Sequence, residues 1–155
     1  MSDTRLIVAA ENPHGADCLA LMTELTGELS ARYDDDGGAS SFTPDDALVP
    51  SSAFLVARVD GQPVGCGAIR PLDSATAEVK RMYVSPKARG RGVGRQILRD
   101  LESRARQLGY ALLRLETGLK QPEAIGLYES EGYVRVECYG KYSANPLSVC
   151  FEKRL

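Results

Sequence analysis

The sequence predicts one α/β domain spanning residues 1–155, with a mixed sheet of about seven strands and roughly four helices. Three observations lead to this fold class. Short apolar runs bounded by Gly, Pro or Asp are typical of strands, and longer segments with apolar residues three or four positions apart are typical of helices. A glycine-rich stretch between a strand-like run and a helical pattern is typical of a strand–loop–helix unit.

The N-terminal part of the chain predicts a strand, two helices and a three-stranded antiparallel meander. Asn12 is the expected N-cap of the first helix, Pro13 its first residue and Tyr33 its end. His14 is expected in the first turn of that helix, as a solvated or capping side chain. The turn Asp60–Gly61 joins the first two strands of the meander. The expected strands are 5–10, 52–59, 63–69 and 77–84, and the second helix begins at residues 43–46.

The C-terminal part predicts two more helices and three more strands. The first of these helices follows the glycine-rich stretch and ends at Gly109, a residue at which helices commonly stop. The next strand is expected to lie parallel to strand 77–84, because strand–helix–strand crossovers normally join parallel neighbours. The second helix begins at Pro122 and is closed by Gly132. The expected strands are 111–117, 133–139 and 148–155, and the last of them could pair within or between subunits.

The glycine-rich stretch at residues 89–95 carries the main functional signal. Glycines at 90, 92 and 94 let the backbone turn tightly and expose successive N–H groups at a helix start, which favours an anion such as phosphate. The spacing differs from that of a Walker loop and from that of a dinucleotide-binding fingerprint. Basic residues crowd the same window: Lys87, Arg89, Arg91, Arg95 and Arg99. We therefore predict a pyrophosphate-binding loop.

Composition narrows the classes of function. A net charge of −2 gives no reason to expect a nucleic-acid or membrane partner, and no apolar run is long enough to cross a bilayer. Residues 1–10 lack a signal-peptide pattern, so the expected location is the cytoplasm. The four cysteines show no Cys-x-x-Cys spacing and are expected to be buried free thiols. With a single histidine, we expect no metal site and no Ser-His-Asp triad.

Two motifs make the sequence resemble the GCN5-related N-acetyltransferase (GNAT) superfamily. Residues 89–94, Arg-Gly-Arg-Gly-Val-Gly, match the family's Arg/Gln-x-x-Gly-x-Gly/Ala motif. Residues 121–133 are similar to its Asn-x-x-Ala-x-x-Leu-Tyr-x-x-x-Gly-Phe/Tyr motif, with Gln121 where the family often has Asn. The two motifs occur in the family's order, and the expected elements over the whole chain agree with it.

The resemblance implies a GNAT-like fold and acetyl-coenzyme A as the donor. In such a fold the mixed seven-stranded sheet is mostly antiparallel, and its fourth and fifth strands splay apart to admit the pantetheine arm. The arm would pair with the backbone of residues 82–84, as an added strand would, and the pyrophosphate would meet the amides of residues 89–95. The implied donor-binding residues are Met82, Tyr83, Val84, Arg89, Gly90, Arg91, Gly92, Val93, Gly94, Arg95 and Gln121.

The resemblance also implies acetyl transfer by direct attack of a primary amine in a ternary complex. Tyr128 of the second motif corresponds to the general acid that protonates the leaving thiolate, or alternatively packs on the apolar face of its helix. Glu78 could accept the amine proton through water, or could instead be a strand carboxylate paired with a nearby Lys or Arg. A backbone N–H near Val84 is the expected partner of the oxyanion.

The residues expected to face the acceptor carry both signs of charge. Acidic side chains suit a cationic amine and arginines suit a carboxylate, so the expected acceptor is a small primary amine, including an amino-acid-like one. The alternatives are a protein lysine or N-terminus as acceptor, and a non-catalytic acyl-coenzyme A-binding sensor; a homodimer is also expected. The candidate acceptor residues are Arg32, Tyr33, Asp34, Asp35, Asp36, Arg70, Glu116, Thr117, Tyr139 and Tyr142.

Overall fold

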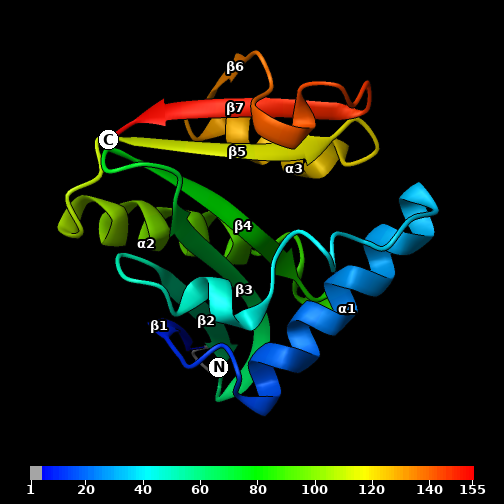
Figure 1. Ribbon diagram of the computed structural model, residues 1–155. Helices are drawn as coiled ribbons and strands as arrows, with labels where there is room; N and C mark the ends of the chain where they lie inside the picture. The colour runs from blue at the N-terminus through cyan, green and yellow to red at the C-terminus, as the bar shows by residue number, and fades with distance from the viewer. Residues whose placement is uncertain (1–4) are drawn as a thin grey trace.

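The computed structural model describes residues 5–155, which form one seven-stranded sheet with the strand order β1-β2-β3-β4-β5-β7-β6 (Figure 1). Within these residues only β4 and β5 pair in parallel, and the other neighbouring strands are antiparallel. The predicted mixed, mostly antiparallel sheet is therefore confirmed. The strands are β1 (Leu6–Ala10), β2 (Ala53–Val59), β3 (Gln62–Pro71), β4 (Thr76–Val84), β5 (Leu112–Gly118), β6 (Val134–Val136) and β7 (Ser148–Arg154).

Three α-helices and three short 3-10 turns accompany the sheet in the described part of the chain. The helix expected to begin at residues 43–46 is one of these turns, closed by a capping box between Thr43 and Asp46. The helices are α1 (Ala16–Tyr33), α2 (Val93–Gln107) and α3 (Pro122–Ser130), and the turns are η1 (Pro44–Ala47), η2 (Pro86–Ala88) and η3 (Gly140–Tyr142).

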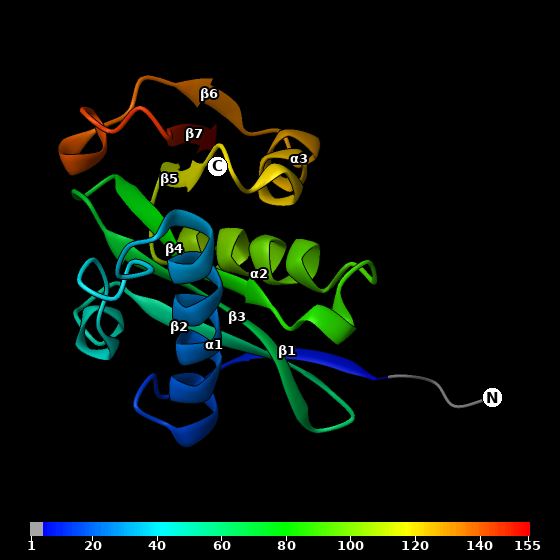
Figure 2. The same cartoon turned by 90° about the vertical axis from the view of Figure 1, so that its right-hand side faces the viewer.

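The helices α1 and α2 cover opposite faces of the sheet (Figures 1 and 2). Alternation along β2 shows this arrangement, because Leu55 packs in the core with α2 and its neighbour Phe54 packs in the core with α1. Gly67 of β3 lets α2 approach closely, since a Cβ there would lie 2.9 Å from Ile97 and 3.0 Å from Leu101. The sheet is thus the middle layer of three.

In residues 5–155, β4 and β5 pair only at their beginnings. Thr76–Glu78 pairs with Leu112–Arg114, and beyond these residues the two strands diverge (Figure 1). A β-bulge accompanies the divergence, because the register between β3 and β4 shifts between Cys66 and Ala68 and Arg81 adopts a φ of 57°. The gap expected between the fourth and fifth strands therefore exposes one edge of β4.

The first helix begins later than the sequence suggested. Gly15, rather than Asn12, is the N-cap of α1, and Pro13 and His14 lie before the helix. The reason is a turn closed by Asn12, whose Oδ1 accepts a hydrogen bond from the N–H of His14 at 2.9 Å. The His14 ring then contacts Asp45 of η1, with 2.7 Å between Nε2 and Oδ1.

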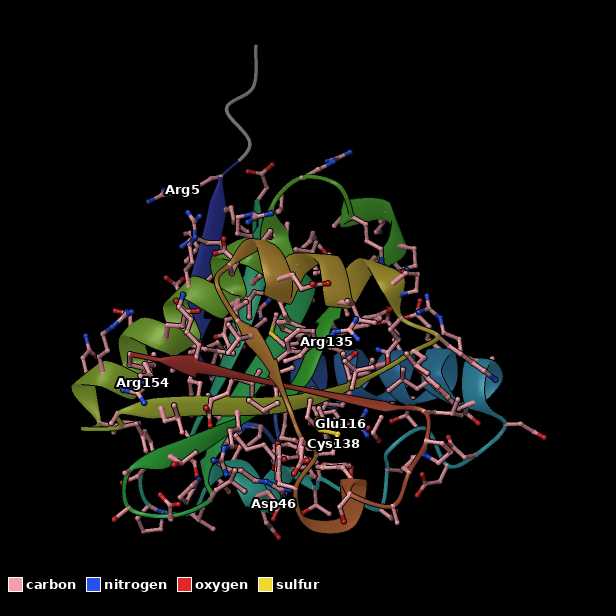
Figure 3. All side chains as sticks on the ribbon, turned by 90° about the horizontal axis from the view of Figure 1, so that it is seen from above. Arg5, Asp46, Glu116, Arg135, Cys138 and Arg154 are labelled. Atoms are coloured by element: carbon pink, nitrogen blue, oxygen red, sulfur yellow. A yellow bond between two sulfur atoms is a disulfide. The ribbon has the colours of Figure 1, made fainter. Side chains whose placement is uncertain are left out.

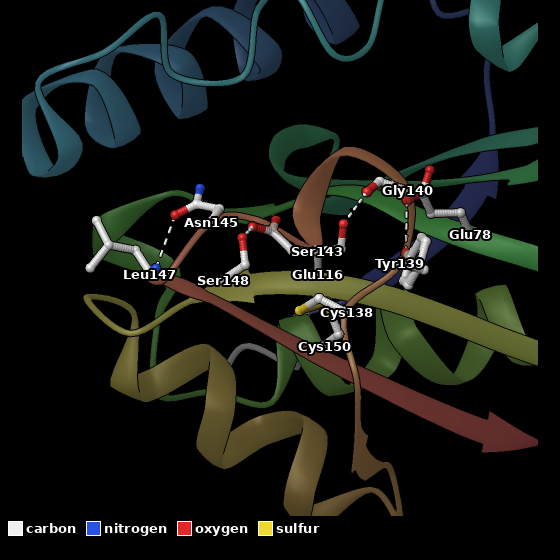
Figure 4. The surroundings of a disulfide bond; sticks show 10 residues. All are labelled: Glu78, Glu116, Cys138, Tyr139, Gly140, Ser143, Asn145, Leu147, Ser148 and Cys150. Atoms are coloured by element: carbon white, nitrogen blue, oxygen red, sulfur yellow. Dashed lines mark hydrogen bonds between the residues drawn. A yellow bond between two sulfur atoms is a disulfide. The ribbon is translucent and has the colours of Figure 1, made fainter.

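The structure also corrects the expectation that all four cysteines are free thiols. Cys138 and Cys150 form a disulfide, with their Cα atoms 5.1 Å apart, whereas Cys18 and Cys66 are buried free thiols as expected. The pairing of β6 with β7 places Val136 opposite Cys150 and so brings the two cysteines together (Figure 3). The bond closes a loop, residues 139–149, that runs from β6 back into β7 (Figure 4).

The C-terminal strand is an inner strand of the sheet. β7 pairs with β5 along its whole length on one side and with β6 over residues 150–152 on the other, so it pairs within the chain on both sides. β6 is shorter than the expected strand 133–139, because the chain leaves the sheet to enter the disulfide-closed loop. Within the described residues, no helix has the length and apolarity that crossing a membrane requires, and no group of His, Cys, Asp or Glu side chains is placed to hold a metal ion.

Candidate active site

A cavity of about 310 Å³, which we call the donor cavity, opens where the second half of β4, the loop after it, α2 and α3 meet. Of the eleven residues predicted to bind the donor, its wall contains all but Arg91, and it also contains Tyr128. Most of the remaining wall residues were not predicted from the sequence. They lie mainly on α1 and α3, at positions where the apolar periodicity indicates packing. The missed residues are Leu25, Glu28, Ala88, Glu123, Ala124 and Leu127.

The glycine-rich loop presents free amides to the donor cavity. Gly90 and Gly92 adopt φ angles of 77° and 79°, which favour glycine, and Gly92 is the N-cap of α2. No side chain caps this end of the helix, and within the described chain the N–H groups of residues 90–95 donate to no acceptor. Free N–H groups at a helix start bind anions, so the loop fits a phosphate group.

The arginine side chains of this loop are largely engaged within the protein. Arg89 pairs with Glu28 at 2.7 Å and also donates from Nε to the carbonyl oxygen of Val84 at 2.8 Å. Arg95 pairs with Glu131 at 2.6 Å. Arg91 is exposed and lies outside the wall of the donor cavity. The fit for phosphate therefore comes from the backbone, and the arginines add positive potential around it.

The free edge of β4 adds polar backbone groups to the donor cavity. The N–H of Ser85 donates to the carbonyl oxygen of Val64 on β3 at 2.8 Å. Because successive residues of a strand point their polar groups to opposite sides, the N–H of Val84 faces the gap between β4 and β5. The side chain of Tyr83 lies on the α1 face, where its hydroxyl donates to Glu24 at 3.2 Å.

Tyr128 lies deep in the donor cavity. It is 5% exposed, and its ring packs against those of Tyr133 and Phe151, with centroids 5.8 and 5.9 Å away. Burial, and to a lesser degree the negative charge of Glu116, raises the pKa of the Tyr128 hydroxyl. The phenol is therefore protonated at neutral pH, the state that a proton donor needs.

A second cavity of about 300 Å³, which we call the acceptor cavity, lies between the loop after α1 and the loop that the disulfide closes. It contains several of the residues predicted to face the acceptor, together with hydroxyl and lysine side chains that were not predicted. Its wall consists of Leu29, Tyr33, Asp35, Asp36, Gly37, Gly38, Ser40, Ser41, Lys80, Glu116, Gly118, Gln121, Lys141, Tyr142, Asn145 and Leu147.

A smaller cavity of about 120 Å³ joins the other two and is called the connecting cavity below. It shares Met82 and Tyr128 with the donor cavity, and Lys80 and Glu116 with the acceptor cavity. Gln121 lines all three. The three cavities therefore adjoin one another along the gap between β4 and β5, and Tyr128 lies where the donor and connecting cavities meet.

Tyr33 and Gln121 form a contact beside these cavities. The hydroxyl of Tyr33 donates to Oε1 of Gln121 at 3.2 Å and accepts the N–H of Lys120 at 3.2 Å. Gly118 makes the contact possible, because a Cβ at this position would overlap the Tyr33 hydroxyl. Thr117, the residue before it, lines the connecting cavity and has a buried hydroxyl with no partner among residues 5–155.

Arg32 and Arg70, both predicted to face the acceptor, lie outside the acceptor cavity. Arg32 lines the donor cavity, where it pairs with Glu123 at 2.8 Å. Arg70 pairs with Glu78 at 3.0 Å and with Asp46 at 3.3 Å. Sequence reasoning placed these two arginines by their charge alone and had no information on their partners.

Glu78 is a buried, ion-paired carboxylate. It is 1% exposed, its Oε1 accepts a hydrogen bond from Nε of Arg70 at 3.0 Å, and its Oε2 accepts one from the hydroxyl of Tyr139 at 2.8 Å (Figure 4). It belongs to the wall of none of the three cavities. Glu78 therefore has the geometry of a strand carboxylate paired with an arginine, which is the alternative interpretation given for it from the sequence.

Lys80 is a candidate that sequence reasoning missed. Its Nζ donates to the hydroxyl of Tyr142 at 2.7 Å, and burial lowers its pKa to about 8. Glu116 of β5 lines the same two cavities, accepts a hydrogen bond from Ser148 at 2.6 Å, and has a pKa raised by burial (Figure 4). A signal existed, because Lys80 lies two residues after Glu78 and therefore on the same face of a predicted strand.

Comparison with known proteins gives a consistent result over most of the chain. The family described as the acetyltransferase (GNAT) family matches residues 19–133. A protein of Azospirillum brasilense named IAA acetyltransferase is 45% identical over 107 residues, 68% of this chain and 70% of that protein. An uncharacterized N-acetyltransferase of Bacillus subtilis is 35% identical over 108 residues, 68% of this chain and 72% of that protein.

Solved structures share the same fold. A proposed acyl-CoA N-acyltransferase from Klebsiella pneumoniae superimposes with a TM-score of 0.81 and 34% identity, over 97% of both chains. A GNAT family acetyltransferase from Elizabethkingia anophelis with acetyl-CoA bound has a TM-score of 0.72 and 19% identity, over 97% of this chain and 98% of the other. At that identity the second likeness concerns the fold alone.

Proposed function

This chain belongs to the GNAT family of acetyltransferases, and from that membership we propose that it transfers an acetyl group from acetyl-coenzyme A to the primary amine of a small molecule, by direct attack in a ternary complex. The observation that carries the proposal is the position of Tyr128. Tyr128 lines both the donor cavity and the connecting cavity, so its hydroxyl would lie between the two substrates.

The residues present fit acetyl-coenzyme A as the donor. The free N–H groups of residues 90–95 would hold the pyrophosphate at the start of α2. The open edge of β4 at residues 82–84 would pair with the pantetheine arm, and Gln121 would close the arm in from the side of α3. When bound, acetyl-coenzyme A supplies the acetyl group as an activated thioester.

The residues around the connecting cavity divide the chemistry of the transfer between them. The N–H of Val84 would stabilise the negative charge on the carbonyl oxygen of the acetyl group, and Tyr128 would donate its proton to the departing sulfur. Glu116 is better placed than Glu78 to accept the amine proton, because it lines the connecting cavity and Glu78 lines no cavity. Its pKa, raised by burial, suits that role. We assign Glu78 a positioning role through Arg70 and Tyr139.

A small acceptor is favoured over a protein side chain by the size of the acceptor cavity. Its walls come from two loops and the sheet, and its volume of about 300 Å³ suits a compact molecule. The A. brasilense relative is named an IAA acetyltransferase, so IAA belongs in any panel of candidate acceptors.

The test is a coenzyme A release assay with acetyl-coenzyme A and a panel of small amines, a lysine-rich peptide and a free N-terminal peptide. The proposal expects turnover with at least one small amine and little with the peptides. Preferential turnover of a peptide would replace the small acceptor with a protein one. Tight binding of acetyl-coenzyme A without turnover of any amine would contradict catalysis and indicate a sensor.

A further inference from the structure

Resting on the proposed function, we propose that the acceptor is a small amino carboxylate. Its carboxylate would bind Lys80, and its amino group would lie beside Glu116. The inference depends on two charged side chains of these adjoining cavities that lack an ionic partner in the described chain.

Lys80 is a half-buried cation without a carboxylate partner. Among residues 5–155, its Nζ makes one side-chain hydrogen bond, to the uncharged hydroxyl of Tyr142 at 2.7 Å, and no carboxylate oxygen lies within 4.0 Å. An ammonium group can donate three hydrogen bonds, and a charge withdrawn from water is costly unless it is paired. Lys80 is therefore arranged to receive an anion from outside the chain.

Glu116 is the corresponding anion. Its Oε2 accepts a hydrogen bond from the hydroxyl of Ser148, and among the described residues no cation lies within 4.0 Å of it. Three other carboxylates that are withdrawn from solvent are ion-paired. These pairs are Glu78 with Arg70 at 3.0 Å, Glu102 with Lys153 at 3.2 Å and Glu131 with Arg95 at 2.6 Å.

The other charged groups of the acceptor cavity have different surroundings. Asp35 and Asp36 are exposed and accept hydrogen bonds from backbone N–H groups of their own loop. Arg81 lines the connecting cavity rather than the acceptor cavity, and its guanidinium donates twice to the carbonyl oxygen of Gly37, at 3.1 and 3.2 Å. Lys141 is exposed at the rim, where it adds positive potential. Lys80 and Glu116 are therefore the inner charges that a ligand can satisfy.

The placement of the two side chains sets the orientation of the ligand. Both line the connecting cavity and the acceptor cavity, and Glu116 is close enough to Tyr128 for its charge to raise the pKa of that phenol. An amino group beside Glu116 would thus lie near the transfer chemistry. A molecule with one ammonium and one carboxylate would neutralise both side chains at once. A phosphate dianion would carry a second negative charge next to Glu116, so a carboxylate is the better match.

The first experiment compares acceptors that differ only in the carboxylate. Leucine is assayed against leucinamide and 3-methylbutylamine, phenylalanine against its amide and phenethylamine, and β-alanine against its amide and ethylamine. Loss of a charge-assisted hydrogen bond costs roughly ten- to a hundredfold in kcat/KM. We expect at least one amino carboxylate to exceed its amide and its amine by that factor.

The second experiment separates the two residues. Lys80→Met should lower kcat/KM for the preferred amino carboxylate by roughly ten- to a hundredfold more than it lowers kcat/KM for the matched amine. Glu116→Gln should lower kcat/KM for both, because both present an amino group. Arg154→Met is the control, since Arg154 is an exposed cation at the far end of β7, away from Glu116 (Figure 3). Lys80→Gln provides a second variant if Lys80→Met folds poorly, with acetyl-coenzyme A affinity checked in each case.

The outcomes distinguish this inference from the proposed function. Amines that turn over as well as their amino carboxylates would overturn the inference and leave small-amine acetylation intact. A carboxylate preference that survives both Lys80→Met and Lys80→Gln would also overturn it. Absence of coenzyme A release with every acceptor would overturn the proposed function and the inference together.

Discussion

The hydroxyl of Tyr139 donates a hydrogen bond of 2.8 Å to Glu78, a residue 61 positions earlier in the chain. Three residues further on, the hydroxyl of Tyr142 accepts a hydrogen bond of 2.7 Å from Nζ of Lys80. Both tyrosines belong to the loop 139–149, which the disulfide closes (Figure 4). This loop therefore connects the charged residues of β4 to one wall of the acceptor cavity.

Breaking the disulfide should loosen the acceptor cavity and leave the donor cavity unchanged. Cys138→Ser is expected to raise the KM of the acceptor several-fold, because Tyr142 and its neighbours lose a fixed position, while the KM of acetyl-coenzyme A stays within about twofold. The free energy of unfolding should fall by about 3 kcal/mol, the entropic value for a loop of this length. Steady-state kinetics and denaturant unfolding measure the two effects.

Dithiothreitol offers a matched comparison for the disulfide prediction. The wild-type protein in the reductant should behave like Cys138→Ser, whereas Cys138→Ser itself should not respond to it. Equal changes in both KM values, or none, would show that the loop does not control the acceptor cavity.

Tyr128→Phe should lower kcat by about 10²–10⁴-fold if the phenol is the proton donor. The ring would keep its packing against Tyr133 and Phe151, so the free energy of unfolding and the affinity for acetyl-coenzyme A should change little. Rapid-quench or steady-state assays at saturating substrates give kcat, and calorimetry gives the affinity. An unchanged kcat would remove Tyr128 from the mechanism.

The elements around the donor cavity could be predicted from the sequence. The glycine-rich loop, the start of α2 and the neighbouring β4 are contiguous in the chain, so a local motif predicts their structure. The order of elements along the chain also predicts the parallel pair β4–β5 correctly, because a crossover helix imposes that arrangement.

The acceptor side was predicted only in part: Tyr33, Asp35, Asp36, Glu116 and Tyr142 line the acceptor cavity, whereas Arg32 and Arg70 do not. The strand pattern places Lys80 on the same face as Glu78, but its missing carboxylate partner becomes visible only when Tyr142 and Glu116, from distant segments, lie around it. The disulfide has the same origin, since Cys138 and Cys150 meet through the pairing of β6 with β7. Whether a charge is paired inside the protein or faces a cavity depends on residues that are distant in the sequence. The spacing of residues along the chain does not carry that information.

Gly92→Val tests the phosphate-binding loop. A β-branched residue at a φ of 79° is strained, and its side chain would disturb the N–H groups at the start of α2, so the KM of acetyl-coenzyme A should rise at least tenfold. Gly109→Val is the matched control, because Gly109 has a φ of 90° at the other end of α2 and lines none of the three cavities. Both variants should lose stability, and a similar loss of acetyl-coenzyme A affinity in both would contradict the assignment.

Lys80→Met should raise the stability of the protein at neutral pH. Burial lowers the pKa of Lys80 from its ordinary 10.5 to about 8; the positive charges of Arg70 and Lys141 also disfavour the ammonium, whereas the negative charges of Glu78 and Glu116 favour it. The unfolded chain therefore binds more protons than the folded one between these two pH values. Above pH 10.5, Lys80 is uncharged in both the folded and the unfolded state and costs no stability. The folded state loses stability as the pH falls from 10.5, and the loss is complete below about 8, where Lys80 is charged in both states.

Methionine at position 80 removes this pH-dependent penalty, because it has no charge to desolvate. Thermal melts from pH 6.5 to 10.5 should show Lys80→Met with the higher Tm below pH 8, and the difference should shrink steadily above it. The same substitution is expected to impair the acceptor reaction. Lys80 would therefore destabilise the folded protein and at the same time contribute to binding of the acceptor. A Tm difference that does not depend on pH would show that the charge of Lys80 is not the destabilising feature.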